Sequence, residues 1–390
     1  MRVYALVLMI AAVSTYLLVP LVLRVAIAVG AITQLRSRDV HNHPIPRLGG
    51  VAMYLGLVVS FVMASQIPYL GNVFARDSGA WAVLAGAGVM CLIGVLDDVW
   101  ELTWYAKLAG EVIAAGVMAW FGVQFVSLPI FGLTVGSMRL TLFATIIVVV
   151  VVVNAVNFID GLDGLAAGVV GIGALAFLFY AYYLTRLASP GDYSSVATGV
   201  VAGLVGICIG FLPHNFHEAR IFMGDSGALM LGTVISGATI LVTGQIDPAK
   251  VDTAFAVPAY MPIMLPVLVL IIPVVDMVWA VIRRVAQGKS PFEADAGHLH
   301  HRLLRRGHSH TAAVLVLYMW AGLVSLGSVA TVVYPTRMWI PALVLAFVLA
   351  VVITRRNFGK RYIVKREREE SLNEHRSGGE HRDIDSMSAR

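Results

Sequence analysis

The chain is poor in charged residues. Only 13% of its 390 residues are Asp, Glu, Lys or Arg, whereas soluble globular domains have about 25%. In contrast, 58% are hydrophobic. This balance excludes an ordinary soluble domain, and it predicts a polytopic membrane protein that contacts the lipid bilayer and no nucleic acid.

Cysteine is nearly absent too. Cys91 and Cys208 both lie in apolar stretches, so we expect neither to form a disulfide or to bind a metal. The first apolar stretch lacks a basic start and a small-residue cleavage site, which predicts a retained anchor. No internal repeat is apparent, and this weighs mildly against a duplicated transporter architecture.

The apolar stretches predict an all-α fold. A membrane-spanning helix needs about 20 apolar residues. We expect a transmembrane catalytic domain over residues 1–354 and a charged, disordered cytosolic tail over 355–390. About eleven spans are predicted, at 3–23, 49–66, 80–96, 108–123, 140–159, 165–185, 195–212, 227–243, 257–282, 312–333 and 338–354.

The distribution of Lys and Arg predicts the orientation. Cytoplasmic loops of membrane proteins are enriched in these residues. With the N-terminus outside, only six of the 28 basic residues lie in outer segments, and the C-terminus is cytosolic. We therefore expect a multi-pass protein of the plasma or inner membrane. The six outer residues are Arg2, Arg76, Arg139, Arg186, Lys250 and Arg337.

A polar motif interrupts the apolar run that begins at Leu140. Residues 154–168 read NAVNFIDGLDGLAAG, in which Asn154, Asn157, Asp160 and Asp163 recur every three residues. On a helix end or tight turn several of these side chains can converge. Neighbouring carboxylates repel each other, so we expect a cation among them. A polar loop between two spans is the plain alternative.

Two further acidic positions lie at predicted inner helix ends. Asp97 and Asp98 follow an apolar run, where the helix dipole disfavours negative charge, and Lys107 begins the next segment. Asp225 begins a helix among small residues, where an anion or a metal–phosphate complex is readily bound. Simple helix caps are the alternative readings. Glu111, within the next span, should face the bundle.

Basic residues lie in other inner loops. Arg47 closes a loop rich in Arg, His and Pro, and Arg283 and Arg284 end a span. A helix over HLHHRLLRR would align His298, His301, Arg302 and Arg305 on one side, as a surface for phosphate. Membrane anchoring by anionic lipid is the alternative. Acidic ligands for Mg²⁺ together with basic groups for phosphate indicate phosphoryl transfer, with a lipid substrate.

The same motifs carry a resemblance. Asp97-Asp98, NAVNFIDGLDGLAAG, FMGDSG and GHLHH, in this order, resemble those of the bacterial polyprenyl-phosphate N-acetylhexosamine-1-phosphate transferases over about residues 30–310. The resemblance implies a phosphotransferase that uses Mg²⁺, or Mn²⁺ in its place. It would move N-acetylglucosamine 1-phosphate from UDP-N-acetylglucosamine to undecaprenyl or decaprenyl phosphate, releasing UMP, as the first membrane step of an envelope polysaccharide.

Other functions stay open. The His-Leu-His-His form resembles the branch that uses UDP-N-acetylglucosamine, whereas the branch that uses UDP-N-acetylmuramoyl-pentapeptide tends to show three consecutive histidines. Another UDP-N-acetylhexosamine is a second alternative. A transporter or flippase for an anionic solute is the alternative of a different class, although transporters usually place charge near mid-membrane. A homodimer also stays open as a partner.

The resemblance also implies residue roles. Asp225 would bind the metal with help from Asn157, and Asp97, supported by Asp98, would orient or deprotonate the lipid phosphate. The nucleotide side would be held by Asp160 and Asp163, with Phe222 stacked on uracil. The diphosphate would be contacted by His298, His300 and His301 with Arg283 or Arg284, and the remaining expected substrate contacts are Asn154, Arg302, Arg47 and Lys107.

Overall fold

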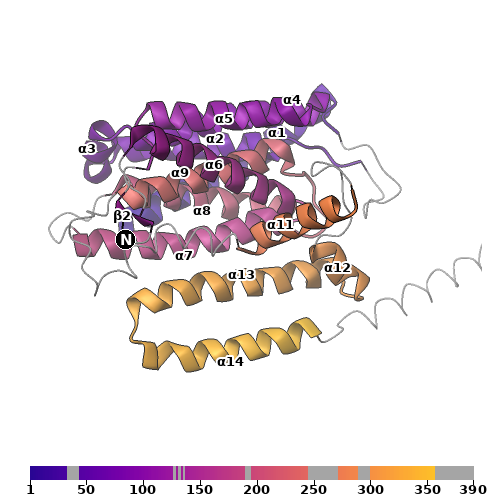
Figure 1. Cartoon of the computed structure of the whole chain (residues 1–390). Coiled ribbons are helices and arrows are strands. Elements are labelled where there is room, and N and C mark those ends of the chain that lie inside the picture. Colours follow the sequence, from indigo (N-terminus) through magenta and orange to yellow (C-terminus); the bar gives the residue numbers. More distant parts are fainter. Residues whose placement is uncertain are drawn as a thin grey trace, which may run out of the picture.

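A computed structural model describes residues 1–32, 44–125, 129–130, 133–134, 137–188, 195–244, 271–288 and 299–355, and they form a bundle of α-helices (Figure 1). The all-α polytopic class is therefore confirmed. The helices are α1 (Arg2–Val29), α2 (Gly49–Gln66), α3 (Pro68–Arg76), α4 (Gly79–Trp100), α5 (Trp104–Trp120), α6 (Met138–Ile159), α7 (Leu165–Ala188), α8 (Val196–Asn215), α9 (Gly224–Gly244), α11 (Ile271–Ala286), α12 (Leu299–Arg305), α13 (His310–Val333) and α14 (Thr336–Arg355).

Within these described ranges, nine helices are long and apolar enough to cross a membrane. The predicted span at 108–123 corresponds to α5, which has only 17 residues and is not among the nine. The predicted span at 257–282 is described only from residue 271, so the count of eleven stays a prediction. The tail beyond residue 355 and Lys250 also lie outside the described residues.

Two short elements lie between the spans. Helix α3 was not predicted, because its nine residues are too few for a spanning segment; Pro68 occupies its first turn, where a missing N–H is harmless. The second element is the antiparallel pair β1 (Pro129–Ile130) and β2 (Leu133–Thr134).

Helix α9 lies at the centre of the bundle. In its most apolar stretch 94% of the residues are buried, compared with 28% in α1 and 6% in α14. Glycines allow two helices to approach it closely. A Cβ atom on Gly50 of α2 would lie 2.0 Å from the backbone of Gly227, and one on Gly94 of α4 would lie 2.3 Å from that of Ser226. The N-terminus of α9 is thus fixed against α2 and α4.

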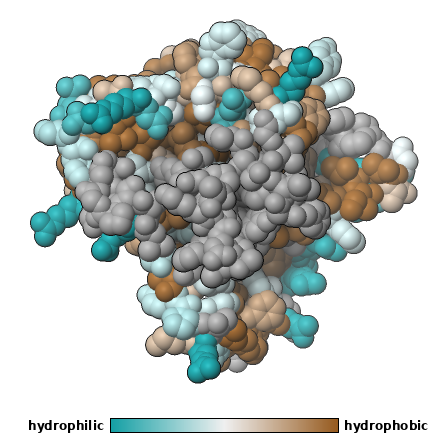
Figure 2. Space-filling model, turned by 60° about the vertical axis from the view of Figure 1, so that its left-hand side comes forward, coloured by the Kyte–Doolittle hydropathy of each residue, from teal (hydrophilic) through white to brown (hydrophobic). Residues whose placement is uncertain are grey.

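Hydrophobic side chains also cover the outside of the bundle. Leu17 and Val13 of α1 and Val344 and Leu345 of α14 are exposed, as expected for residues that face lipid. Figure 2 shows brown, hydrophobic residues spread over the flanks of the molecule, with teal, hydrophilic residues scattered around its periphery.

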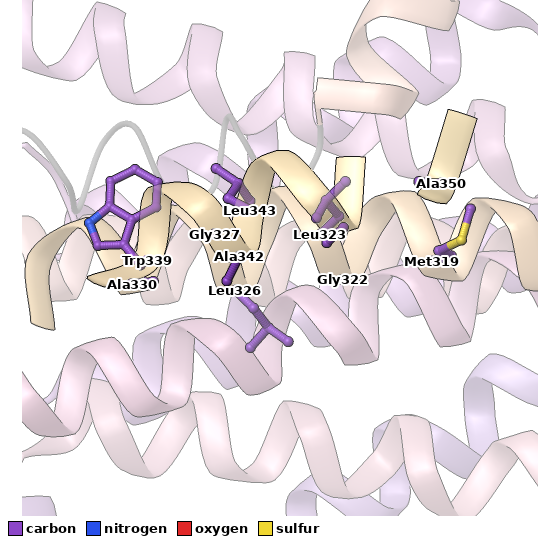
Figure 3. Close-up of a pocket in the computed structure, with 11 residues that line it drawn as sticks. Met319, Gly322, Leu323, Leu326, Gly327, Ala330, Trp339, Ala342, Leu343 and Ala350 are labelled. Atoms are coloured by element: carbon purple, nitrogen blue, oxygen red, sulfur yellow. The ribbon is translucent and has the colours of Figure 1, made fainter. Parts of the chain in front are cut away.

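Helix α14 lies outside the main bundle, beside α13 (Figure 1). The two helices leave a cavity of about 410 Å³ between them (Figure 3). Near the end of α14 they are joined by polar contacts, since Trp320 Nε1 donates to Thr354 Oγ1 at 2.9 Å. The cavity lining is apolar, with small residues from both helices: Met319, Gly322, Leu323, Leu326, Gly327, Ala330, Trp339, Ala342, Leu343, Ala346 and Ala350.

Candidate active site

The carboxylate of Asp98 caps the first turn of α9. Its two oxygens accept hydrogen bonds from the backbone N–H groups of Asp225 and Ser226, at 3.0 and 3.1 Å. The first N–H groups of a helix lack partners within the helix and favour negative charge. Asp98 lies near the C-terminal end of α4, where the helix dipole disfavours a negative charge. The contact compensates for this, because it places the carboxylate against the N-terminus of α9. Arg47 Nη1 lies 3.9 Å from the same carboxylate.

A cation lies among the acids at this end of the bundle. The ammonium nitrogen of Lys107, in the first turn of α5, is 2.6 Å from Asp97 Oδ2 and 2.7 Å from Asp225 Oδ2. The other oxygen of Asp97 accepts a hydrogen bond from the backbone of Leu102 at 2.7 Å, so Asp97 also closes the turn between α4 and α5. Three helices therefore meet at one ammonium group.

The amide of Asn157 reaches the same carboxylate. Its Nδ2 donates to Asp225 Oδ1 at 3.2 Å, which brings together the two residues expected to bind metal. Asp160 follows at the end of α6. Burial, reinforced by the neighbouring charges of Asp225 and Asp98, raises the pKa of Asp160 to about 8. We call the group of Asp97, Asp98, Asp160 and Asp225, with Lys107 and Asn157, the acidic site.

Asp163 has a different surrounding. Its Oδ2 accepts from the backbone N–H of Ala219 at 3.1 Å, and its own N–H donates to His310 Nε2 at 3.2 Å. The next residue, Gly164, has a φ of +73° and donates to Asn215 Oδ1 at 2.9 Å. These contacts hold the loop between α6 and α7 against α8 and α13. His310 and Asn215 were missed by sequence reasoning, because nothing local marks their partner.

Asn154 contacts Glu111 instead of Asp225. Its Nδ2 donates to Glu111 Oε2 at 2.7 Å and to the backbone oxygen of Val150 at 2.9 Å. Glu111 is 2% exposed, so the expectation that it faces the bundle is confirmed. A substrate contact by Asn154 stays a prediction.

The remaining predicted residues lie on other elements or outside the described ranges. Phe222 is half-buried and joins the segment before α2, where its N–H donates to Pro46 at 2.9 Å. The guanidinium of Arg284 is buried over the ring of Phe158, at 5.6 Å. Arg283 is half-buried at the end of α11 and Arg302 is exposed on α12, which also contains His300 and His301; His298 lies outside the described residues.

The donors present fit a hard divalent cation. Mg²⁺ takes carboxylate and amide oxygens as ligands, and Asp225 and Asn157 are in direct contact. Lys107 holds a positive charge between the carboxylates of Asp97 and Asp225, which shows that a cation fits between them. No ready-made cluster of three or more His, Cys, Asp or Glu ligands occurs among the described residues, so a metal would draw on the amide or on substrate oxygens.

Comparisons with known proteins agree on one family. The model of glycosyl transferase family 4 matches residues 80–243, which contain all the residues of the acidic site. Decaprenyl-phosphate N-acetylglucosaminephosphotransferase of Mycolicibacterium smegmatis is 39% identical over 365 residues, covering 91% of this chain and 88% of the relative. The protein of that name from Mycobacterium tuberculosis is 40% identical, covering 91% and 89%. A probable undecaprenyl-phosphate N-acetylglucosaminyl 1-phosphate transferase of Bacillus subtilis is 32% identical, covering 87% of each chain.

Proposed function

This chain belongs to glycosyl transferase family 4, and we propose that it transfers N-acetylglucosamine 1-phosphate from UDP-N-acetylglucosamine to a polyprenyl phosphate. An oxygen of the lipid phosphate would attack the phosphorus that carries the sugar, and the bond from that phosphorus to UMP would break. The products are UMP and a polyprenyl-diphospho-N-acetylglucosamine. The names of the relatives support both the sugar and the lipid acceptor.

One observation carries the proposal: four helix ends bring acids, an amide and a lysine to one point. Phosphoryl transfer depends mainly on positioning and on neutralising the negative charge of the phosphates. Asp225 and Asn157 would hold Mg²⁺, which neutralises diphosphate charge when bound. Because the acidic site lies at the ends of membrane-spanning helices, a lipid phosphate at the membrane surface can reach it.

The residues of the chain have distinct tasks. Asp98 fixes the N-terminus of α9 and with it Asp225. Lys107 keeps the carboxylates of Asp97 and Asp225 together and offers a positive charge near the reacting phosphates. Asp97 positions the incoming phosphate through Lys107, whose ammonium group it holds. On the positive-inside rule, the site faces the cytosol at the plasma membrane, which is where UDP-sugars are made available.

The test is direct enzymology with the purified full-length chain. UDP-N-acetylglucosamine and decaprenyl phosphate are incubated with Mg²⁺, and UMP release is measured; UDP-N-acetylgalactosamine and UDP-N-acetylmuramoyl-pentapeptide serve as competing donors. We expect UMP from the first donor and its near loss in Asp225→Asn. Asp77→Asn is the matched control, because Asp77 caps Gly79 near the other end of α4. If the protein transported an anionic solute and released no UMP, it would be a transporter and not a phosphotransferase.

A further inference from the structure

Two polar contacts join α5 to α6, one helical turn apart. In the lower contact, Lys107 of α5 and Asn157 of α6 both reach the carboxylate of Asp225. In the upper contact, Asn154 of α6 donates to Glu111 of α5. Because Lys107 and Glu111 are four residues apart and Asn154 and Asn157 three, the two pairs lie on the facing sides of the two helices.

The upper contact is buried, and the orientation of its amide group is fixed. Glu111 is 2% exposed, and an ionisable side chain inside a membrane bundle is expensive. Asn154 Nδ2 faces two oxygen atoms, those of Glu111 and Val150, so both of its hydrogens are used and the orientation of the amide is fixed. A direct donation from Asn154 to a substrate would break this arrangement.

We propose that Glu111 is a positioning residue for the acidic site, acting through Asn154. The upper contact fixes the register of α5 against α6, and that register places Lys107 and Asn157 on Asp225 at 2.7 and 3.2 Å. A slip by one residue would move a side chain by about 1.5 Å along the helix axis. Misplacement by about 1 Å can cost 100-fold in rate.

The proposal rests on the proposed function for its activity readout, and a second readout is independent of it. The first experiment compares Glu111→Leu, Asn154→Leu and the double variant in UMP release. We expect each single change to lower kcat by about 10- to 100-fold. The double variant should be no worse than the singles, because both changes remove the same contact. Glu111→Gln, which keeps an acceptor oxygen, should recover most of kcat.

The second readout is the rise in melting temperature on adding Mg²⁺, measured without substrate. Wild type and Glu111→Gln should show it, whereas Glu111→Leu should show a smaller rise because Asn157 is displaced from Asp225. Ile113→Ala, at an exposed position on the same helix, is the matched control and should behave as wild type. If Glu111→Leu does not fold, Asn154→Leu tests the same contact from α6.

A purely structural Glu111 predicts other results. The variants would then lower the melting temperature in the absence of Mg²⁺ while kcat and the Mg²⁺ response stayed at wild-type values. That outcome, or additive effects in the double variant, would overturn the proposal. If wild type itself released no UMP, the proposed function would fail, and the Mg²⁺ response of the variants would still decide the role of Glu111.

Discussion

Replacing Lys107 by methionine tests the charge balance of the acidic site. The substitution keeps an unbranched side chain and removes the ammonium group that lies 2.6 Å from Asp97 and 2.7 Å from Asp225. The three side chains are 28%, 10% and 26% exposed, so water screens their interaction only in part. After the change, the two carboxylates face each other without a compensating charge.

The expected cost follows from the partial burial. Removing one partner of a buried ion pair costs about 3–5 kcal/mol, whereas exposed pairs are worth about 0.2–1 kcal/mol. We expect Lys107→Met to lose about 2–3 kcal/mol of stability without metal, between these limits. Mg²⁺ at about 100 times its dissociation constant would return about 2.7 kcal/mol. The lysine competes with the metal for these carboxylates, so the variant should gain more from Mg²⁺ than wild type does.

The assay is thermal unfolding of the purified protein with a chelator and with increasing Mg²⁺, together with UMP release. Arg139→Met is the control, since Arg139 is an exposed basic residue in the first turn of α6. We expect the largest Mg²⁺-dependent rise in melting temperature in Lys107→Met, with turnover reduced about 100-fold by the lost positive charge. Equal Mg²⁺ responses and unchanged stability in the chelator would refute the reasoning.

Three further predictions concern single positions. Asp97→Asn should lower turnover by a factor that is nearly constant from about pH 6 to 9, because a phosphate monoester with a second pKa near 6 needs no base; recovery at high pH would make Asp97 a base. Since the pKa of Asp160 is raised to about 8, its folded state holds a proton that the unfolded state releases, so stability without metal should fall as the pH rises toward 8. Asp160→Asn should flatten that slope in melting curves. A cysteine at position 300, in a background without the native cysteines, should escape an impermeant thiol reagent in intact cells; labelling from outside would reverse the topology.

Much of the site could be predicted from where polar residues end apolar runs. Asp97, Asn157 and Asp225 each lie at such an end, and helices that alternate in direction bring these ends together. The three-residue spacing of the motif was a weaker guide. Asn154 and Asn157 have this spacing within α6, which ends at Ile159. Asp160 and Asp163 lie beyond the helix, where the left-handed conformation of Gly164 turns the chain away.

Contacts between residues that lie far apart in the sequence could not be predicted from the sequence. Lys107 and Asp225 are 118 residues apart, and Asp98 and Ser226 are 128 apart. The sequence shows that Asp98 has an unfavourable interaction with the dipole of its own helix. It does not show that the N-terminus of α9 compensates for this interaction. Glu111 was expected to face the bundle, but its pairing with Asn154 depends on the register of two helices, which no local pattern specifies.

The interface between α13 and α14 has a mechanical consequence. It contains an open pocket and is held at one end by Thr354, whose backbone oxygen lies 3.2 Å from His308 Nε2 and whose hydroxyl accepts from Trp320. A force applied at the C-terminus acts first on these two contacts of Thr354. Once these contacts break, only the packing of α14 against α13 and its apolar surface in the lipid resist extraction, and its 20 residues would span about 70 Å when fully extended at 3.3–3.6 Å per residue. Pulled this way, the protein should yield α14 as its first rupture, while the helices around the acidic site stay folded.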